Sequence, residues 1–207
     1  APLLDMLRTA GNGGHFVSPI SKEYSHTVGF AFVDDTDLIH LDMRTKETES
    51  EAMTKMQKSI DRWEGGLKTS GGTIVNSKSW VYPISFEFDA HGKWSYKKAE
   101  DVEHDFTVKD DEEIRQVLIS LDHNKGKETL GVYLAPDGNN EEMVKVLKSK
   151  AEEWRDNMNS GHLNKSDAWQ ALETTIMKSL QYPMKALTLS KAECKDIMKP
   201  ILQAGLR

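Results

Sequence analysis

The chain has 207 residues, of which 38% are hydrophobic and 29% are charged, and this composition excludes the disordered and collagen-like classes. No apolar run approaches the roughly 20 residues that a bilayer-spanning helix needs, so we predict no membrane partner. With 27 basic and 33 acidic side chains, the formal net charge of −6 argues mildly against binding through nucleic-acid phosphates alone.

Cysteine usage and the N-terminal residues give expectations about the compartment. The single cysteine, Cys194, has no second cysteine for an internal disulfide, which favours a reducing compartment. The chain begins Ala-Pro-Leu-Leu, without an initiator methionine and without the layout of a signal peptide. We therefore expect a piece of a longer intracellular protein, in the nucleus or the cytoplasm, that is not secreted.

The first strong pattern in chain order is an apolar segment that ends in two aspartates. Leucines and a methionine over residues 3–7 suggest the tail of a helix. Residues 28–33 read Val-Gly-Phe-Ala-Phe-Val and carry no charge, which predicts a strand covered on both faces. Asp34 and Asp35 interrupt this strand, and an extended pattern resumes over residues 38–43. We predict a β-hairpin with the two aspartates at its tip.

A helix with signals at both ends follows the hairpin. Thr48 and Glu51 have the spacing of a capping box. Gly65 and Gly66 are predicted to end the helix. Apolar residues at spacings of three and four define its buried face: Ala52, Met53, Met56, Ile60, Trp63 and Leu67.

Short strands are predicted after this helix. Residues 73–75 and 80–88 have extended patterns, and residues 86–96 resemble a second hairpin that turns at 90–92. The acid-rich stretch 100–113 is typical of a solvated loop or a helix start. A further strand is predicted over 129–134, closed by the turn Pro136–Gly138.

Three helices account for the remainder. The first begins at Asn139 or Asn140 and ends at Gly161, and the second stops before Pro183. The third begins at a capping box, Ser190 with Glu193, and is kinked or ended by Pro200. The apolar faces of the first two comprise Met143, Leu147, Ala151, Trp154 and Met158, then Trp169, Leu172, Ile176 and Leu180.

The predicted fold class is therefore α+β. Residues 1–136 form a small antiparallel sheet with packed helices, and residues 137–207 form a helical bundle.

The aspartates at the hairpin tip are the strongest candidates for chemistry. Two adjacent carboxylates at the end of a buried strand repel one another unless a cation neutralises them. Mg²⁺ prefers one or two carboxylates together with substrate phosphates, and a metal pair of this kind promotes phosphoryl displacement. The alternative is that Asp34 and Asp35 form only a polar turn.

The residues of this hairpin resemble a known family. Phe32-Val-Asp-Asp35 resembles the aromatic-x-Asp-Asp box of reverse transcriptases, which lies on a palm hairpin and binds catalytic Mg²⁺. Trp63–Leu67 followed by Asn76–Ser79 is similar to the next block of that family. Leu130–Val132 is similar to the Leu-Gly strand near the primer grip of retrotransposon enzymes without long terminal repeats. The trailing helices resemble the thumb-side region, so the resemblance covers most of residues 26–205.

The resemblance implies a palm-like sheet, a thumb-like bundle and an RNA-directed DNA polymerase. Asp34 and Asp35 would bind Mg²⁺ or Mn²⁺. Lys78 would protonate or orient the leaving pyrophosphate; the alternative is an ordinary surface lysine beside a strand. Asp37 is interpreted as a partner of the backbone or of Thr36. The primer would be supported by Leu130, Gly131 and Val132.

The implied partners are an RNA or DNA template with its primer and deoxynucleoside triphosphates. The family also needs an aspartate from an upstream strand, and fingers that hold template and nucleotide. Only 25 residues precede the hairpin strand, and their sole aspartate, Asp5, lies in a leucine-rich, helix-like segment, so we expect this fragment to be inactive alone. Two alternatives stay open: a non-catalytic relic or interaction module of the same fold, and a metal-dependent phosphoesterase that uses Asp34, Asp35 and Asp37.

Overall fold

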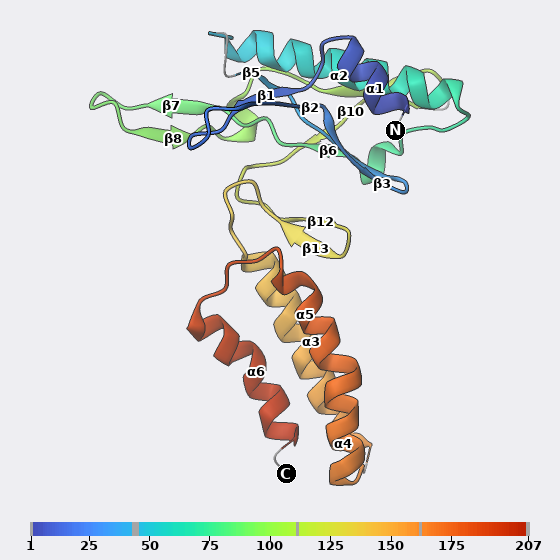
Figure 1. Ribbon diagram of the computed structural model, residues 1–207, viewed down its shortest axis with the longest axis vertical. Helices are drawn as coiled ribbons and strands as arrows, with labels where there is room; N and C mark the ends of the chain where they lie inside the picture. Colours follow the sequence, from blue (N-terminus) through green and yellow to red (C-terminus); the bar gives the residue numbers. More distant parts are fainter. Residues whose placement is uncertain (1, 43–45, 111, 162, 206–207) are drawn as a thin grey trace. The chain divides into compact units, whose positions relative to one another are not determined.

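The computed structural model describes the whole chain except residues 1, 43–45, 111, 162 and 206–207 (Figure 1). Contacts divide it into two compact units, Ala1–His123 and Asn124–Arg207. The division falls before the boundary expected at 136/137, because the hairpin that precedes the first long helix of the second unit packs into that unit's core through Val132.

The first unit contains one three-stranded sheet. Its strands are β1 (Gly14–Val17), β2 (Tyr24–Thr27) and β5 (Leu41–Asp42), in the order β2-β1-β5. β1 pairs antiparallel with β2 and parallel with β5. Helix α1 (Pro2–Thr9) precedes this sheet.

The other strands of the first unit form separate two-stranded sheets. The antiparallel pairs are β3 (Gly29–Phe32) with β4 (Asp35–Leu38), β7 (Phe86–Phe88) with β8 (Trp94–Tyr96), and β9 (Thr107–Lys109) with β10 (Arg115–Val117). The parallel pair is β6 (Trp80–Val81) with β11 (Ile119–Ser120). The α+β class is confirmed, but the described residues form several small sheets and not the single antiparallel sheet that we expected.

Helix α2 (Glu49–Thr69) is the longest element of the first unit. Its capping box is confirmed: the Thr48 N–H donates to Glu51 Oε2 at 2.9 Å, and the Glu51 N–H donates to Thr48 Oγ1 at 3.3 Å. The predicted end at Gly65 and Gly66 is wrong. A Cβ at Gly66 would lie 2.7 Å from Leu3 Cδ2 of α1, so this glycine serves helix packing and not termination.

Two hydrophobic clusters form the core of the first unit. One joins Leu7, Val28 and Trp63. The other gathers side chains from α2 and from the segments that follow it: Met53, Ile60, Val81, Val102, Phe106, Val108 and Leu118. Both clusters take side chains from α2, so this helix organises the unit.

Two strand predictions in this unit need correction. Residues 73–75 are not a strand, and a 3-10 helix (Asn76–Lys78) follows them. The strand predicted over 80–88 is divided into β6 and β7, which pair with different partners. Pro83 lies between them and has no N–H for a strand ladder.

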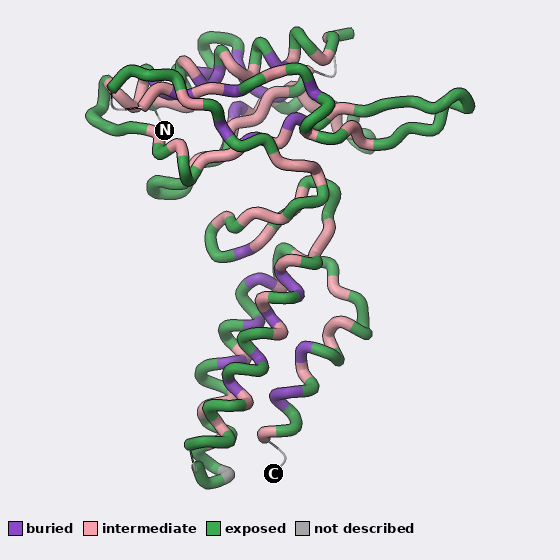
Figure 2. Tube along the Cα trace, turned by 180° about the vertical axis from the view of Figure 1, so that it is seen from behind, coloured by how far each residue is buried: buried purple, intermediate pink, exposed green. Residues whose placement is uncertain are grey.

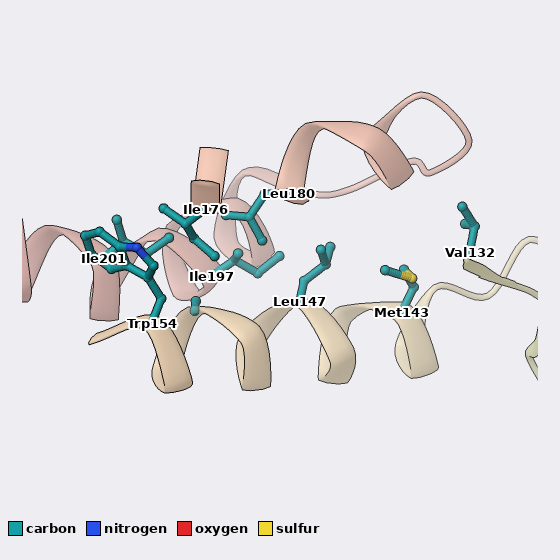
Figure 3. Packing of buried hydrophobic residues seen from close by; sticks show 9 residues of the cluster. Val132, Met143, Leu147, Trp154, Ile176, Leu180, Ile197 and Ile201 are labelled. Carbon is teal, nitrogen blue, oxygen red and sulfur yellow. The ribbon is translucent and has the colours of Figure 1, made fainter. Parts of the chain in front are cut away.

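The second unit consists of a hairpin followed by helices. The hairpin joins β12 (Lys127–Thr129) to β13 (Val132–Leu134). The helices are α3 (Glu141–Ser160), α4 (Lys165–Ala171), a π-helix (Leu172–Ile176), α5 (Met177–Met184) and α6 (Lys191–Gly205). Figure 2 shows the buried stripes of these helices, and Figure 3 shows the side chains of α3, α5 and α6 that meet in the core.

Most helix signals of the second unit are confirmed, including the Ser190–Glu193 capping box.

The prediction that Trp169 packs in the core is wrong, because its side chain is 58% exposed. The π-helix after it inserts an extra residue into the helical turn, which directs Ile176 and Leu180 inward and leaves Trp169 outside. Pro183 and Pro200 lie inside α5 and α6, so neither helix stops before its proline.

Candidate functional site

The β3–β4 hairpin carries the two aspartates singled out in the sequence. Phe32 pairs with Asp35 across a two-residue turn made of Val33 and Asp34. The predicted hairpin is therefore confirmed, with Asp34 in the turn and Asp35 as the first residue of β4.

The predicted burial of this strand is wrong. Phe30 is 64% exposed, Phe32 62% and Val33 90%, whereas Val28, which precedes the strand, is only 2% exposed. The two strands form a sheet of their own, which no other strand of the described residues extends. Asp34 and Asp35 are exposed as well. A cation is therefore not needed to make this carboxylate pair tolerable.

Pairing across the hairpin sorts its side chains onto two faces. Phe30 pairs with Asp37 and Phe32 with Asp35, so these four side chains share one face. Gly29 lies under the partner strand, where a Cβ would come within 2.1 Å of the Asp37 carbonyl oxygen. A glycine at this position therefore permits the close approach of β3 and β4.

The sequence interpretation made Asp37 a partner of the backbone or of Thr36, whereas in the structure its carboxylate interacts with that of Asp35. Desolvation of its carboxyl, and then the negative charge of Asp35, raise the pKa of Asp37 above its ordinary value. The signal was present in the sequence, because residues i and i+2 of a strand lie on the same side. Asp35 and Asp37 are thus neighbours in space, while Asp34 belongs to the turn.

The turn residue Val33 has a strained backbone. Its φ of 56° lies in the left-handed region, where a β-branched residue is an outlier. Two-residue hairpin turns with a positive φ at the first central position ordinarily use glycine there. The conformation costs about 1–2 kcal/mol, and a 90% exposed side chain gains little packing to offset it.

The carboxylates of the hairpin offer an incomplete ligand set for a metal. Within the described ranges, no group of three or more histidine, cysteine, aspartate or glutamate side chains is placed to hold a metal ion. Mg²⁺ is commonly bound by one or two carboxylates, with substrate phosphates and water completing its shell. Asp34 and Asp35 fit that role only together with a phosphate ligand.

Lys78 ends the 3-10 helix Asn76–Lys78, and its side chain is exposed. Its backbone N–H donates to the Val75 carbonyl at 3.0 Å. Among the residues that the structure describes, no ion pair joins the Lys78 ammonium to Asp34 or Asp35. Its contact with a leaving pyrophosphate therefore stays a prediction.

The strand predicted over 129–134 is interrupted in the middle. Leu130 and Gly131 form the turn between β12 and β13, with φ of 52° and 76°. The Tyr182 hydroxyl donates to the Leu130 carbonyl at 2.8 Å, and Val132 is 7% exposed in the core. This segment belongs to the second unit and the aspartates to the first. Its expected support of a primer is not tested by these contacts.

The acid-rich stretch 100–113 is partly structured. Asp110 Oδ1 accepts the N–H groups of Glu112 and Ile114 at 3.0 and 2.9 Å, which shapes the turn before β10. Hydrogen bonds from Lys109 and then Lys68 lower the pKa of Glu113 to about 2. In this turn, acidic side chains have structural partners within the chain.

Comparison of the chain with protein-family models, curated proteins and solved structures finds no match. Along the described ranges, no helix is both long and apolar enough to cross a membrane. Function is therefore inferred from the motifs in their order and from the geometry of the β3–β4 hairpin.

Proposed function

We propose that this chain is part of an RNA-directed DNA polymerase of the retrotransposon type without long terminal repeats. The proposal is supported by the order of the motifs: the Phe32–Asp35 box, the Trp63–Leu67 and Asn76–Ser79 blocks, and the Leu130–Val132 segment. It assigns the first unit to the palm and the second unit to the thumb.

The proposed reaction is Mg²⁺-dependent nucleotidyl transfer. The 3′-hydroxyl oxygen of a primer attacks the α-phosphate of a deoxynucleoside triphosphate, a new P–O bond forms, and pyrophosphate leaves. Asp34 and Asp35 would hold the metal through their carboxylates, with the nucleotide phosphates as further ligands, and the metal would supply charge stabilisation for the entering and the leaving oxygen. Lys78 would neutralise charge on the leaving pyrophosphate.

The observation that carries the proposal is the strained turn at Val33. A turn that served only to reverse the chain would be more stable with glycine at this position. Strain of this kind is found at functional sites, where it fixes the direction of neighbouring groups. Here it holds Asp34 at an exposed tip, next to Asp35, where a bound nucleotide has access to both.

Isothermal titration of the chain with Mn²⁺, in the presence and absence of a deoxynucleoside triphosphate, tests the metal site. We expect binding that the nucleotide strengthens and that Asp34→Asn or Asp35→Asn abolishes. Asp89→Asn is the matched control, because Asp89 also lies at a hairpin turn, where its Oδ1 accepts two backbone N–H groups. Binding that survives Asp34→Asn would contradict the assignment.

A second assay separates the polymerase from the phosphoesterase. The parent polymerase that contains these residues should extend a primer on an RNA template, whereas a phosphoesterase would cleave the nucleic acid without extending it. We expect Asp34→Asn to reduce extension by at least about 100-fold, since it removes a ligand of the metal that stabilises the transition state. Extension that is unchanged in this variant would overturn the proposal.

The exposure of the hairpin supports a second candidate, a non-catalytic interaction module. Phe30 and Phe32 are more than half exposed beside Asp35 and Asp37, as expected for a surface that contacts another macromolecule. The Mn²⁺ titration discriminates between the two, because an interaction module binds no metal at this tip.

A further inference from the structure

An open hollow lies along α6, the last helix of the second unit. Its volume is about 670 Å³, which is within the range of binding clefts in proteins. The residues that line it all belong to α6. Figure 3 shows Ile197 and Ile201 of the same helix directed into the core. The hollow therefore lies on a different face of α6 from the one that packs in the core.

One row of apolar side chains lines the hollow. Cys194, Met198 and Leu202 recur every four residues, so they follow one another along one face of the helix over roughly 12 Å. We call these three residues the apolar row. Cys194 and Met198 are half-buried, and Leu202 is 48% exposed. The apolar row is therefore accessible to a ligand.

A row of lysines runs beside the apolar row. Lys191, Lys195 and Lys199 also line the hollow at intervals of four residues, and all three are exposed. We call them the lysine row. Within the described part of the chain, their ammonium groups make no hydrogen bond and no ion pair. Three positive charges thus border the hollow without a counter-ion.

The carboxylates of α6 do not neutralise the lysine row. Asp196 also lines the hollow, but its Oδ2 pairs with Lys148 Nζ of α3 at 3.3 Å. The Glu193 carboxylate accepts the Ser190 N–H at 2.7 Å in the capping box. No other acidic residue occurs in the sequence of α6. The hollow therefore combines apolar surface with positive charge, which is complementary to a ligand that has negative charges beside apolar groups.

Three other ligands fit this combination less well. A second copy of α6 would bring the same lysines, and both of its carboxylates are engaged within the chain. A nucleic-acid backbone has the negative charge but no apolar side chains to fill the hollow. A helix that binds a lipid surface inserts a protruding apolar face into it, whereas the apolar row of α6 lines a hollow.

An amphipathic helix with acidic flanks has both required features. Its apolar residues recur every three or four positions, which is the repeat of the apolar row, and carboxylates beside them would meet the lysine row. Amphipathic helices dock into apolar grooves in this way. An extended peptide instead draws affinity from main-chain hydrogen bonds to a strand edge, and a helix such as α6 offers no such edge.

We propose that this face of α6 binds an acidic amphipathic helix of a partner protein. Apolar side chains of that helix fill the hollow over the apolar row, and its carboxylates pair with the lysine row. This inference rests on α6 alone and is independent of the proposed polymerase function.

The probe for the test is a peptide of about 18 residues, long enough to form a helix. It has leucine at spacings of three and four, glutamate beside each leucine and alanine elsewhere. One comparison peptide has lysine in place of glutamate, and another has the same composition in an order that scatters the leucines. Isothermal titration of the full 207-residue chain measures the affinities. We expect only the glutamate peptide to bind, and to bind more weakly as salt screens the exposed charges.

Variants of α6 test the two rows separately. Lys195→Glu combined with Lys199→Glu should weaken binding of the glutamate peptide by about tenfold or more, and should allow the lysine peptide to bind. Leu202→Ala should weaken binding of the glutamate peptide by about threefold or more, because it removes apolar contact area. Lys178→Glu is the matched control, because Lys178 is exposed on α5, and it should leave the affinity unchanged.

The single cysteine supplies a second readout. Cys194 is the only cysteine of the chain and lines the hollow, so the bound glutamate peptide should slow its reaction with a thiol reagent. Absent binding of the glutamate peptide, equal binding of the scattered-leucine peptide, or equal loss with Lys178→Glu would each overturn the proposal. Binding of duplex DNA or phosphatidylserine vesicles through the lysine row, without binding of the glutamate peptide, would overturn it as well.

Discussion

Asp35 and Asp37 project from the same face of the β3–β4 hairpin, each opposite an exposed phenylalanine. The two carboxylates that are adjacent in the sequence, Asp34 and Asp35, are divided between the turn and the strand. Electrostatic coupling on this hairpin therefore runs between Asp35 and Asp37, and it raises the pKa of Asp37 in addition to desolvation.

Asp37→Asn should stabilise the chain at neutral pH. Because the folded state raises the pKa of Asp37 above 3.8, its carboxylate destabilises the fold once the pH rises through the raised pKa. The gain should be under ~0.5 kcal/mol, since solvent screens an exposed side chain. It should vanish below pH 3.8, where the carboxyl is protonated in both states.

Urea unfolding as a function of pH measures this effect. In an Asp35→Asn background the gain should be smaller but still present, because desolvation is the larger cause of the shift. A variant that is less stable than the natural chain at neutral pH would contradict the assignment.

Val33→Gly should stabilise the β3–β4 hairpin. Glycine adopts the φ of 56° without the steric cost that valine bears, and we expect a gain of about 1 kcal/mol, seen as a raised urea midpoint. Val75→Gly is the control, because Val75 is 49% exposed with φ of −89°, where glycine only adds flexibility to the unfolded chain. If both variants lose stability equally, Val33 is not strained.

The Glu113 carboxylate should titrate far below an ordinary glutamate. Lys109 Nζ lies 2.7 Å from Glu113 Oε2, and Lys68 binds the other oxygen; together they lower the pKa of Glu113 to about 2. Its contribution to stability is complete above pH 4.5 and is lost as the pH falls towards 2.

Carbon-detected NMR titration of the side-chain carboxyl checks this prediction. Lys109→Met should raise the pKa of Glu113 more than Lys68→Met does, because the hydrogen bond from Lys109 is the larger cause. An ordinary pKa in the natural chain would show that the two lysines do not bind this carboxylate in solution.

Leu147→Ala should strongly destabilise the second unit. Leu147 has 0% exposure on α3, and Figure 3 shows it directed towards α5 and α6. Truncating a buried leucine leaves a cavity and lowers the free energy of unfolding by about 2–5 kcal/mol. In the full chain, this loss should lower the urea midpoint of the transition that unfolds residues 124–207. Leu202→Ala, at a site 48% exposed, should cost less than about 1 kcal/mol; equal losses would contradict the described core.

Local signals in the sequence predicted the elements whose stabilising contacts are also local. The Thr48–Glu51 and Ser190–Glu193 capping boxes each bond residues three apart in the chain, and the tight hairpins at 33–34 and 90–92 depend on neighbouring residues. Predictions failed where a distant element decided the outcome. Gly66 does not end α2 because α1 packs against it. Residues 80–88 are not one strand because β6 pairs with the distant β11 and Pro83, a local signal, separates it from β7.

The sequence by itself determined that Asp34 and Asp35 lie at a hairpin tip, because they interrupt the uncharged run 28–33 and an extended pattern resumes after them. Only the tertiary structure decided that this hairpin is exposed, that Asp37 is the neighbour of Asp35, and that Trp169 lies outside the core. The spacing of apolar residues indicates which side chains favour burial, but a side chain is buried only where another part of the chain packs against it. Whether the chain supplies that surface depends on contacts between residues far apart in the sequence.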